Sequence, residues 1–520
     1  MGNEDRTGLR RHLYALIVVV AAGAATGRIL STENVAGPSL HRPEGAAGDT
    51  RPAWPKTRPE PYPTFGSNDR SRWAAVRALV DDGTWAVGRR DRDTVLDSIA
   101  VPFAGTNPLD VATLHAAAQQ ARVRSDSGIV TEDGWKTVDK VLHPTRLEFY
   151  SSKPPLLTAL AAGEYWLLKK AFGWSITDDR GSVIRTILLT FNVVPLVVYL
   201  LLLGRLADLF GATDWGRLFV VTAAAFATLL TPFLNTFNNH TVATCAAVVA
   251  LYAAVRILLR EGEGPPGRGW FALAGFFAGL TACTETPAAA FAVGLFLALA
   301  LRHPARTAAV FLPAALLPVA AFFSLNYLEL GTFELAYSKT RTLWYNYEGS
   351  HWALINAGQK RGIDAAHFRE TKAAYAFHLL LGHHGWFSLT PINLLGLAGM
   401  IVGVVALLRR RANKARALWA ELAAATLALS AVVICFYAVV TDSRNYGGNS
   451  AGPRWLMWLA PLWLLCMLPV LDWLSVRRWG RALALALLAV SVLSASYPAW
   501  GPWRQPWVYN WMDARGWVPY

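Results

Sequence analysis

Residues 193–203 read VVPLVVYLLLL and carry no charge. Two further uncharged runs, residues 15–25 and 482–492, lie near the two ends of the chain. Only 16% of the 520 residues are charged and 54% are hydrophobic, whereas soluble chains are about 25% charged. A helix needs roughly 20 mostly apolar residues to cross a bilayer, and these runs are too continuous for the alternation of a β-barrel. The composition therefore predicts an all-α polytopic membrane protein.

Apolar segments continue outward from this stretch in both directions. One of them, residues 156–172, is unusual because it contains Glu164, Lys169 and Lys170, and charges inside a span are costly. We expect that segment to lie at the membrane interface, which leaves eleven spans. The expected spans are 12–30, 183–204, 217–234, 241–259, 270–283, 287–301, 307–325, 386–408, 418–440, 455–475 and 482–498.

The orientation follows from the positive charges. With the N-terminus inside, the inside segments hold 18 Lys and Arg and the short outside segments hold 4, as the positive-inside rule requires. The net charge of +14 is then a property of membrane loops, and no nucleic-acid partner is expected. We rank second a topology in which residues 270–301 form one bent span and residues 156–172 cross. Residues 12–31 could also be a cleaved signal peptide, but an uncleaved span is preferred.

This topology divides the chain into six parts. The N-terminus and first span are residues 1–31, the remaining spans of a core module are 183–325, and the C-terminal spans are 386–498. Residues 32–182 and 326–385 are long extracytoplasmic loops, and residues 499–520 are a Trp-rich extracytoplasmic tail. In the first loop we expect a proline-rich linker over 38–63 and surface helices over 72–79 and 111–123. The four cysteines fall in apolar segments and are expected to be buried thiols, not a disulfide or zinc framework.

Four motifs point to a function. The first loop contains Asp69-x-x-Arg72-Trp73, Arg77-x-Leu79-x-x-x-Gly83-x-Trp85 and Lys153-Pro154-Pro155-Leu156, and Gly452-Pro453-Arg454-Trp455 opens a late span. The three loop motifs resemble the first loop of the GT-C glycosyltransferases, above all the branch of the protein O-mannosyltransferases and lipid A aminoarabinose transferases. The fourth is similar to a Gly-Pro-Arg-Tyr motif that often opens a late span in that superfamily. One position departs from the pattern, because Arg70 stands where the family has Glu, so a metal or acceptor role of that Glu is not carried over.

The resemblance implies inverting transfer of a hexose or pentose from a polyprenyl-phosphate donor to a hydroxyl of a glycan, lipid or protein. The enzyme would work on the extracytoplasmic face of the plasma membrane, among membrane lipids. Asp69 is the expected base, and its alternative role is to cap a helix. Lys153, Arg72 and Arg454 are the expected ligands of the donor phosphate, and the alternative for Lys153 is an interfacial anchor.

Polar residues near the ends of spans are candidates for substrate binding. Asn238, Asn239 and His240 either bind sugar hydroxyls or cap the helix that starts at Thr241. Glu285 lies between two short apolar segments, where a carboxylate at membrane depth is a functional candidate or caps the second half-helix. Tyr446 belongs to a short loop, also containing Asp442, that either lines the site or is an ordinary turn.

Three histidines occur in the stretch HLLLGHHG, namely His378, His383 and His384. We do not predict a metal there, because no cysteine or carboxylate completes a ligand set nearby in the sequence. Contact with phosphate or sugar is the preferred interpretation of His383 and His384. No cofactor is assigned, although a divalent metal is left open. The tryptophans after Trp500 are read as an interfacial belt, with platforms for sugar rings as the alternative.

Two other classes of function compete with the enzyme. A transporter or flippase of lipid or polysaccharide should show internal repeats and ionisable residues along a midplane path, and neither pattern is clear here. A membrane assembly subunit without activity would tolerate the loss of Asp69. The sequence alone does not identify the sugar or the acceptor.

Overall fold

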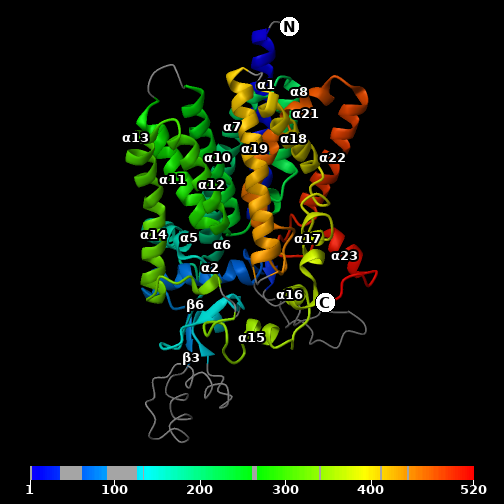
Figure 1. The fold of residues 1–520 in the computed structure, drawn as a ribbon. Helices are drawn as coiled ribbons and strands as arrows, with labels where there is room; N and C mark the ends of the chain where they lie inside the picture. The colour runs from blue at the N-terminus through cyan, green and yellow to red at the C-terminus, as the bar shows by residue number, and fades with distance from the viewer. Residues whose placement is uncertain are drawn as a thin grey trace, which may run out of the picture. The chain divides into compact units, whose positions relative to one another are not determined.

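The computed structural model describes residues 3–35, 61–90, 126–132, 134–260, 266–338, 341–409, 413–441 and 444–520 (Figure 1). The predicted surface helix at 111–123, most of the linker at 38–63, and Asp442 lie outside these residues. The described chain is mostly helical, as the composition predicts. Within it, seven helices are long and apolar enough to cross a membrane: Thr7–Ser31, Arg180–Phe210, Asp214–Phe233, Asn239–Leu259, Pro304–Leu330, Lys414–Val440 and Arg478–Ser496.

The four other expected spans are shorter or broken helices. Arg268–Thr284 and Thr286–Ala300 flank a break at Glu285, and Asn393–Arg409 is a 17-residue helix. Arg454–Cys466 and Leu468–Ser475 form a pair bent by 43°. The count of eleven spans therefore stays a prediction. The helix at Pro155–Phe172, expected at the interface, is not among the seven candidate spans of the described residues.

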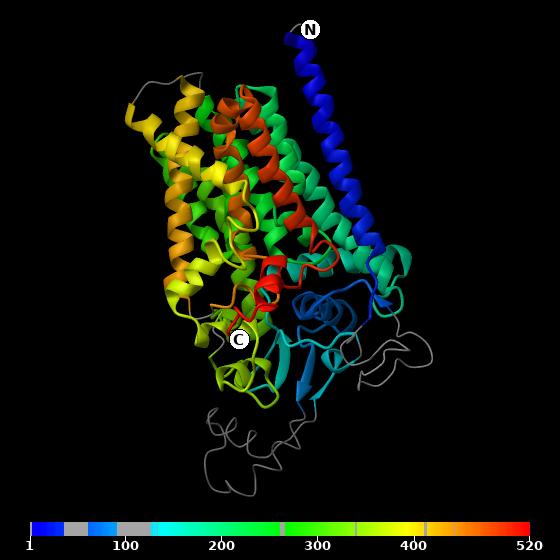
Figure 2. The same ribbon diagram turned by 90° about the vertical axis from the view of Figure 1, so that its right-hand side faces the viewer.

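The chain forms two compact units. Residues 1–28, 189–321 and 362–520 make up the first, and residues 29–188 and 322–361 make up the second. In the first unit the long helices run side by side (Figure 1), and α1 is one continuous helix (Figure 2). The helices wholly or mostly in this unit are α1 (Asn3–Ser31), α7 (Val194–Phe210), α8 (Asp214–Phe226), α9 (Leu230–Phe233), α10 (Asn239–Leu259), α11 (Arg268–Thr284), α12 (Ala289–Ala300), α13 (Pro304–Arg306), α14 (Leu312–Leu330), α16 (Ala366–Arg369), α17 (Lys372–Leu380), α18 (Asn393–Arg409), α19 (Lys414–Cys435), α20 (Ala460–Cys466), α21 (Leu468–Ser475), α22 (Arg478–Ser496) and α23 (Trp507–Asp513).

Polar side chains cap several of these helices. Asn238 accepts a hydrogen bond from the amide of Thr241 and so starts α10. Thr371 accepts one from the amide of Ala374 at the start of α17. Such a cap contributes about 1 kcal/mol, because it satisfies an amide that has no partner in the first turn. The capping role suggested for the 238–240 stretch therefore belongs to Asn238.

Glycine allows close approach between α18 and α20. A Cβ atom placed on Gly399 would overlap the carbonyl oxygen of Cys466, and one on Gly403 would overlap the Cβ of Ala423 in α19. Membrane helices use small residues in this way, because dispersion contacts between close backbones replace a hydrophobic driving force that lipid does not supply.

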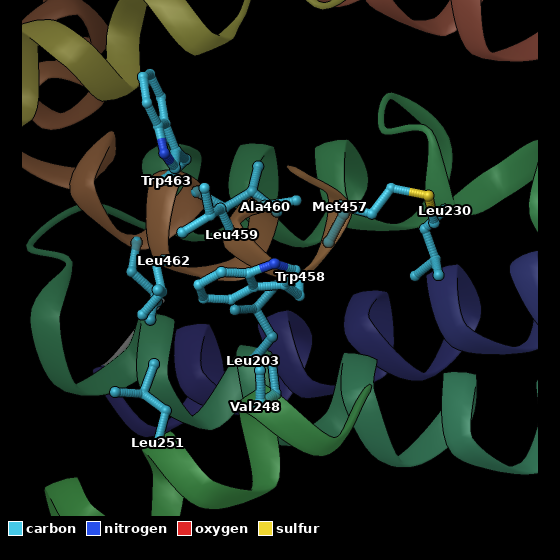
Figure 3. Packing of buried hydrophobic residues seen from close by; sticks show 14 of the residues in the cluster. Leu203, Leu230, Val248, Leu251, Met457, Trp458, Leu459, Ala460, Leu462 and Trp463 are labelled. Atoms are coloured by element: carbon cyan, nitrogen blue, oxygen red, sulfur yellow. The ribbon is translucent and has the colours of Figure 1, made fainter. Parts of the chain in front are cut away.

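The core of the first unit surrounds Trp458, which is fully buried. Figure 3 shows its indole ring beside Leu203 of α7 and Val248 of α10. A second tryptophan, Trp463, donates a hydrogen bond from Nε1 to Ser430 Oγ over 2.9 Å. These rings join the bent 454–475 segment to the long helices, so the segment is packed inside the helical bundle of this unit.

One expectation about the cysteines needs revision. All four are free thiols, but Cys435 is exposed on α19 whereas the other three are buried.

The tryptophans of the tail differ in their surroundings. Trp511 and Trp517 are exposed, but Trp503 donates to Thr236 Oγ1 and packs edge-on against Phe233. The indole N–H of Trp503 therefore has an internal partner, and the interfacial belt stays a prediction.

The second unit corrects the purely helical expectation. Its helices are α2 (Ser67–Arg77), α5 (Pro155–Phe172), α6 (Arg180–Leu188) and α15 (His351–Asn356). Beside them lies an antiparallel sheet of order β4-β3-β6-β5, formed by Asp126–Ser127, Gly88–Arg90, Glu148–Ser151 and Lys140–Leu142, and the two-residue strands β1 (Asn34–Val35) and β2 (Pro61–Tyr62) pair separately. The strands have two to four residues, too few to show the alternation that identifies a strand in a sequence.

Candidate active site

Asp69 lies in the first turn of α2, which begins at Ser67, five residues before the predicted helix over 72–79. The N-cap position belongs to Gly66. The Asp69 side chain is 1% exposed. Its Oδ1 accepts a hydrogen bond from Trp73 Nε1 over 2.9 Å, and its Oδ2 accepts one from the Phe65 amide over 3.1 Å. These two bonds, one to each carboxylate oxygen, fix the orientation of the side chain.

Lys153 directly precedes α5, which Pro154 caps and Pro155 begins. Its ammonium donates to Asp139 Oδ1 over 2.7 Å, and both side chains are 14% exposed. Sequence reasoning missed Asp139, because nothing in the pattern links an aspartate in the sheet region to the Lys-Pro-Pro motif. The pair holds the lysine at the sheet end of α5.

Two serines tie these elements together. Ser71 Oγ lies 2.7 Å from Ser151 Oγ, and the contact is buried. Ser71 also donates to the carbonyl oxygen of Asp139 over 2.5 Å, and the amide of Lys153 donates to Ser151 Oγ over 3.2 Å. The helix that carries Asp69 is therefore bonded to the turn that carries Lys153, although 80 residues separate the two serines.

The arginines of α2 have distinct surroundings. Arg70 donates to the carbonyl oxygens of Lys136 and Phe65, each over 3.0 Å, so it stabilises the loop around α2. Arg77 pairs with Glu132 over 2.7 Å, which makes it structural. Arg72 is buried at 1% exposure and follows Asp69 by three residues, which places it on the same face of the helix.

In the first unit, Asn239, His240 and Glu285 come together. Asn239 Nδ2 donates to Glu285 Oε1 over 2.8 Å, and His240 Nδ1 lies in close contact with the same oxygen. Glu285 is 5% exposed and stands at the break between α11 and the turn before α12. Three residues from two separate candidate sites are therefore in contact in the structure. Their contact with substrate stays a prediction.

His383, His384 and Tyr446 also come together in the first unit. His383 Nδ1 lies 2.6 Å from His384 Nδ1, and the ring of Tyr446 stacks on that of His384 at 5.0 Å. Each of the three side chains is at most 1% exposed. Tyr446 has a positive φ of 57°, a conformation that costs a non-glycine residue about 1–3 kcal/mol. The proposed contact of these residues with substrate is likewise untested.

Glu370 completes this cluster, and sequence reasoning missed it. The hydroxyl of Tyr446 donates to its Oε2, whereas its Oε1 is buried without a hydrogen-bond partner. Burial favours the neutral acid, but His383, Tyr446 and His378 together outweigh burial and hold the pKa of Glu370 below its ordinary value. Burial, reinforced by His383, lowers the pKa of His378 to about 4. The prediction that no carboxylate completes a ligand set near these histidines is therefore wrong.

Arg454 lies in the first unit with the 444–448 loop. Its guanidinium stands over the ring of Trp503 at 4.7 Å, and a Cβ on Gly447 would crowd its Nε. Gly447 has a φ of 93°, so glycine is required there for both its conformation and its lack of a side chain. Asn445 donates to Asp364 Oδ1 over 3.0 Å. Arg454 thus packs against this loop, and its assignment to the donor phosphate remains a prediction.

No family model and no curated protein matches the chain. The structure has a weak likeness to solved structures of the Archaeoglobus fulgidus oligosaccharyltransferase. The form tethered to an acceptor peptide has a TM-score of 0.42 at 13% identity and covers 97% of this chain and 57% of that one. The apo form gives 0.42 at 12% identity, with 97% and 58% coverage. The complex with an inhibitory peptide and a dolichol-phosphate gives 0.40 at 13% identity, with 98% and 58% coverage.

This chain therefore spans less than two thirds of the length of those proteins. At such TM-scores and identities the likeness carries over neither fold nor activity. A proposal of function therefore has to rest on the residues of this chain.

Proposed function

We propose that this chain is a membrane glycosyltransferase that transfers a sugar, with inversion, from a polyprenyl-phosphate donor to an acceptor hydroxyl. The observation that supports the proposal most is the hydrogen bond between Ser71 and Ser151. It ties the helix of Asp69 to the turn of Lys153, so the two motifs of the resemblance, which are far apart in the sequence, belong to one bonded structure.

The residues of the second unit suit the two halves of the reaction. Asp69 takes the proton of the acceptor hydroxyl. The hydroxyl oxygen attacks the anomeric carbon from the side opposite the phosphate, and the bond from that carbon to the phosphate oxygen breaks. The polyprenyl phosphate leaves with the electron pair, and a cation near the leaving oxygen stabilises the developing charge. Lys153 and Arg72 are the cations assigned to that role.

The pairing of Lys153 with Asp139 is compatible with phosphate binding. An ammonium has three protons, and Asp139 Oδ1 uses one. The Asp139 carboxylate orients the lysine and partly neutralises its charge. We therefore expect the phosphate to bind beside Asp139 and not in its place.

The test is a transfer assay with purified protein in lipid nanodiscs and a panel of polyprenyl-phosphate sugars and alcohol acceptors. Wild type should release polyprenyl phosphate and form a glycoside of inverted anomeric configuration. Asp69→Asn should not, whereas Asp82→Asn should behave as wild type, because Asp82 is an exposed carboxylate just beyond α2. Failure of the wild type to consume any donor, or full activity of Asp69→Asn, would overturn the proposal.

A further inference from the structure

The buried cluster around Glu370 has the composition of a metal site. One ligand atom each from Glu370, His378 and His383 lies within 4.8 Å of the other two. Glu370 Oε1 is 4.0 Å from His378 Nε2 and 3.9 Å from His383 Nε2. Glu370 follows α16, His378 lies on α17, and His383 lies in the turn after α17. One short segment therefore brings three potential ligands, a carboxylate and two imidazoles, close together.

The carboxylate lacks a cationic partner within hydrogen-bond distance. The Glu370 side chain is 3% exposed, and among the described residues its Oε1 accepts no hydrogen bond. None of its described ion-pair partners is a lysine or arginine. Burying a carboxylate oxygen without a partner is costly. A cation at the point shared with the two imidazoles would remove that cost.

We propose that Glu370, His378 and His383 bind a divalent first-row transition metal, with Zn²⁺ as its representative. Two imidazoles and one carboxylate suit Zn²⁺ or Fe²⁺ and disfavour Mg²⁺ and Ca²⁺, which select oxygen ligands. Ligands at 2.0–2.1 Å from a tetrahedral ion are roughly 3.3 Å apart. The observed separations of 3.9 and 4.0 Å are longer than this, so the side chains must draw closer. The rings of His378 and His383, which stack at 4.1 Å with planes 16° apart, must also turn so that both nitrogens face the ion.

The hydroxyl of Tyr520 lies near the position that a fourth ligand of the metal would occupy. It lies 2.9 Å from His383 Nε2, the ring nitrogen nearest Glu370. Metal binding therefore exchanges that hydrogen bond for coordination, and the hydroxyl or a water can take the fourth site. The opposite nitrogen of His383 contacts His384, a second contact that fixes the ring's orientation, as ligating histidines require.

The test uses the full chain, purified without a histidine tag and stripped with a chelator, and titrates it with ZnCl₂ by calorimetry. Wild type should bind one Zn²⁺ per chain, and its unfolding temperature should rise with Zn²⁺ concentration. Glu370→Gln and His378→Gln should weaken binding by more than about 100-fold, beyond the range for outer partners of a metal site. His12→Gln, which removes an exposed histidine from α1, should bind as wild type does.

A spectroscopic measurement keeps the test decisive if the variants fail to fold. X-ray absorption of the Zn²⁺-loaded wild type should show two imidazoles and only nitrogen and oxygen ligands. The absence of stoichiometric Zn²⁺, unchanged affinity in folded Glu370→Gln, or a sulfur-containing shell would each overturn the site. The proposal is independent of sugar transfer, because each of these readouts is made without donor or acceptor.

Discussion

The ammonium of Lys153 lies 2.7 Å from the carboxylate of Asp139, so the cation assigned to the donor phosphate already has an anionic neighbour. This pair anchors the turn at the start of α5. Lys153 could therefore anchor the turn or take part in donor use. Substituting either partner alone distinguishes these two roles.

Lys153→Ala should lower kcat/KM for the polyprenyl-phosphate sugar by roughly tenfold to a hundredfold. The reason is that a hydrogen bond to a charged group contributes about 1.5–3 kcal/mol. Lys153→Arg should recover part of this loss. Asp139→Asn removes the negative charge beside the lysine and should cost less than Lys153→Ala. Equal donor use by Lys153→Ala and wild type would show that the lysine is only an anchor.

Asp69→Asn should reduce kcat by about 10²–10⁴-fold, because a positioned base contributes that much. Donor binding, measured separately by calorimetry, should persist. Trp73→Phe removes the 2.9 Å hydrogen bond to Asp69 Oδ1 and part of a fully buried ring, but it keeps the base, so it should lower kcat by a smaller factor. A larger loss in Trp73→Phe than in Asp69→Asn would indicate that the helix, and not the base, limits activity.

Tyr446→Phe should lower the unfolding temperature in detergent. The variant loses the hydroxyl that donates to Glu370, which leaves a buried carboxylate poorly satisfied at a cost of about 1–3 kcal/mol. The strained φ of Tyr446 is then no longer offset by that bond. Tyr327→Phe, at a tyrosine that is 50% exposed, is the control and should melt as wild type. Equal melting of the two variants would argue against a stabilising contact.

Gly399→Val should strongly destabilise the first unit, because any side chain at this position overlaps the backbone of Cys466. Overpacking typically costs about 1–3 kcal/mol. Gly294→Ala on α12 meets nothing within 4 Å and should be neutral or slightly stabilising, since alanine is the better helix former. Thermal unfolding in matched detergent compares the two. A stable Gly399→Val protein would mean that α18 and α20 can separate freely.

The orientation of the loops can be read with single cysteines in a background lacking native thiols, including the exposed Cys435. Thr177→Cys and Gln359→Cys should react with an impermeant thiol reagent from outside the cell. Arg268→Cys and Lys414→Cys should react only after the membrane is broken. All four positions are exposed, so differences report the side of the membrane. Protection at 177 with reactivity at 268 would show that residues 156–172 cross.

Features that depend on neighbouring residues could be predicted from the sequence. The uncharged runs predict long helices, because lipid satisfies no backbone amide and a helix bonds its own. Pro287 and Glu285 mark a break between two half-helices, and α11 does end at Thr284. The Pro-Pro pair after Lys153 predicts a helix start, and α5 begins at Pro155. Charges at 164, 169 and 170 set that helix apart from the spans.

Features that depend on distant residues were decided by the tertiary structure alone. Glu370 meets Tyr446 across 76 positions, and Lys153 meets Asp139 through a sheet whose strands are too short to show a period. Neither contact has a fixed spacing, because the partners are brought together by packing of whole elements and not by the geometry of one helix or strand. The local sequence therefore determined the helices, whereas the tertiary structure determined which groups surround each candidate site residue.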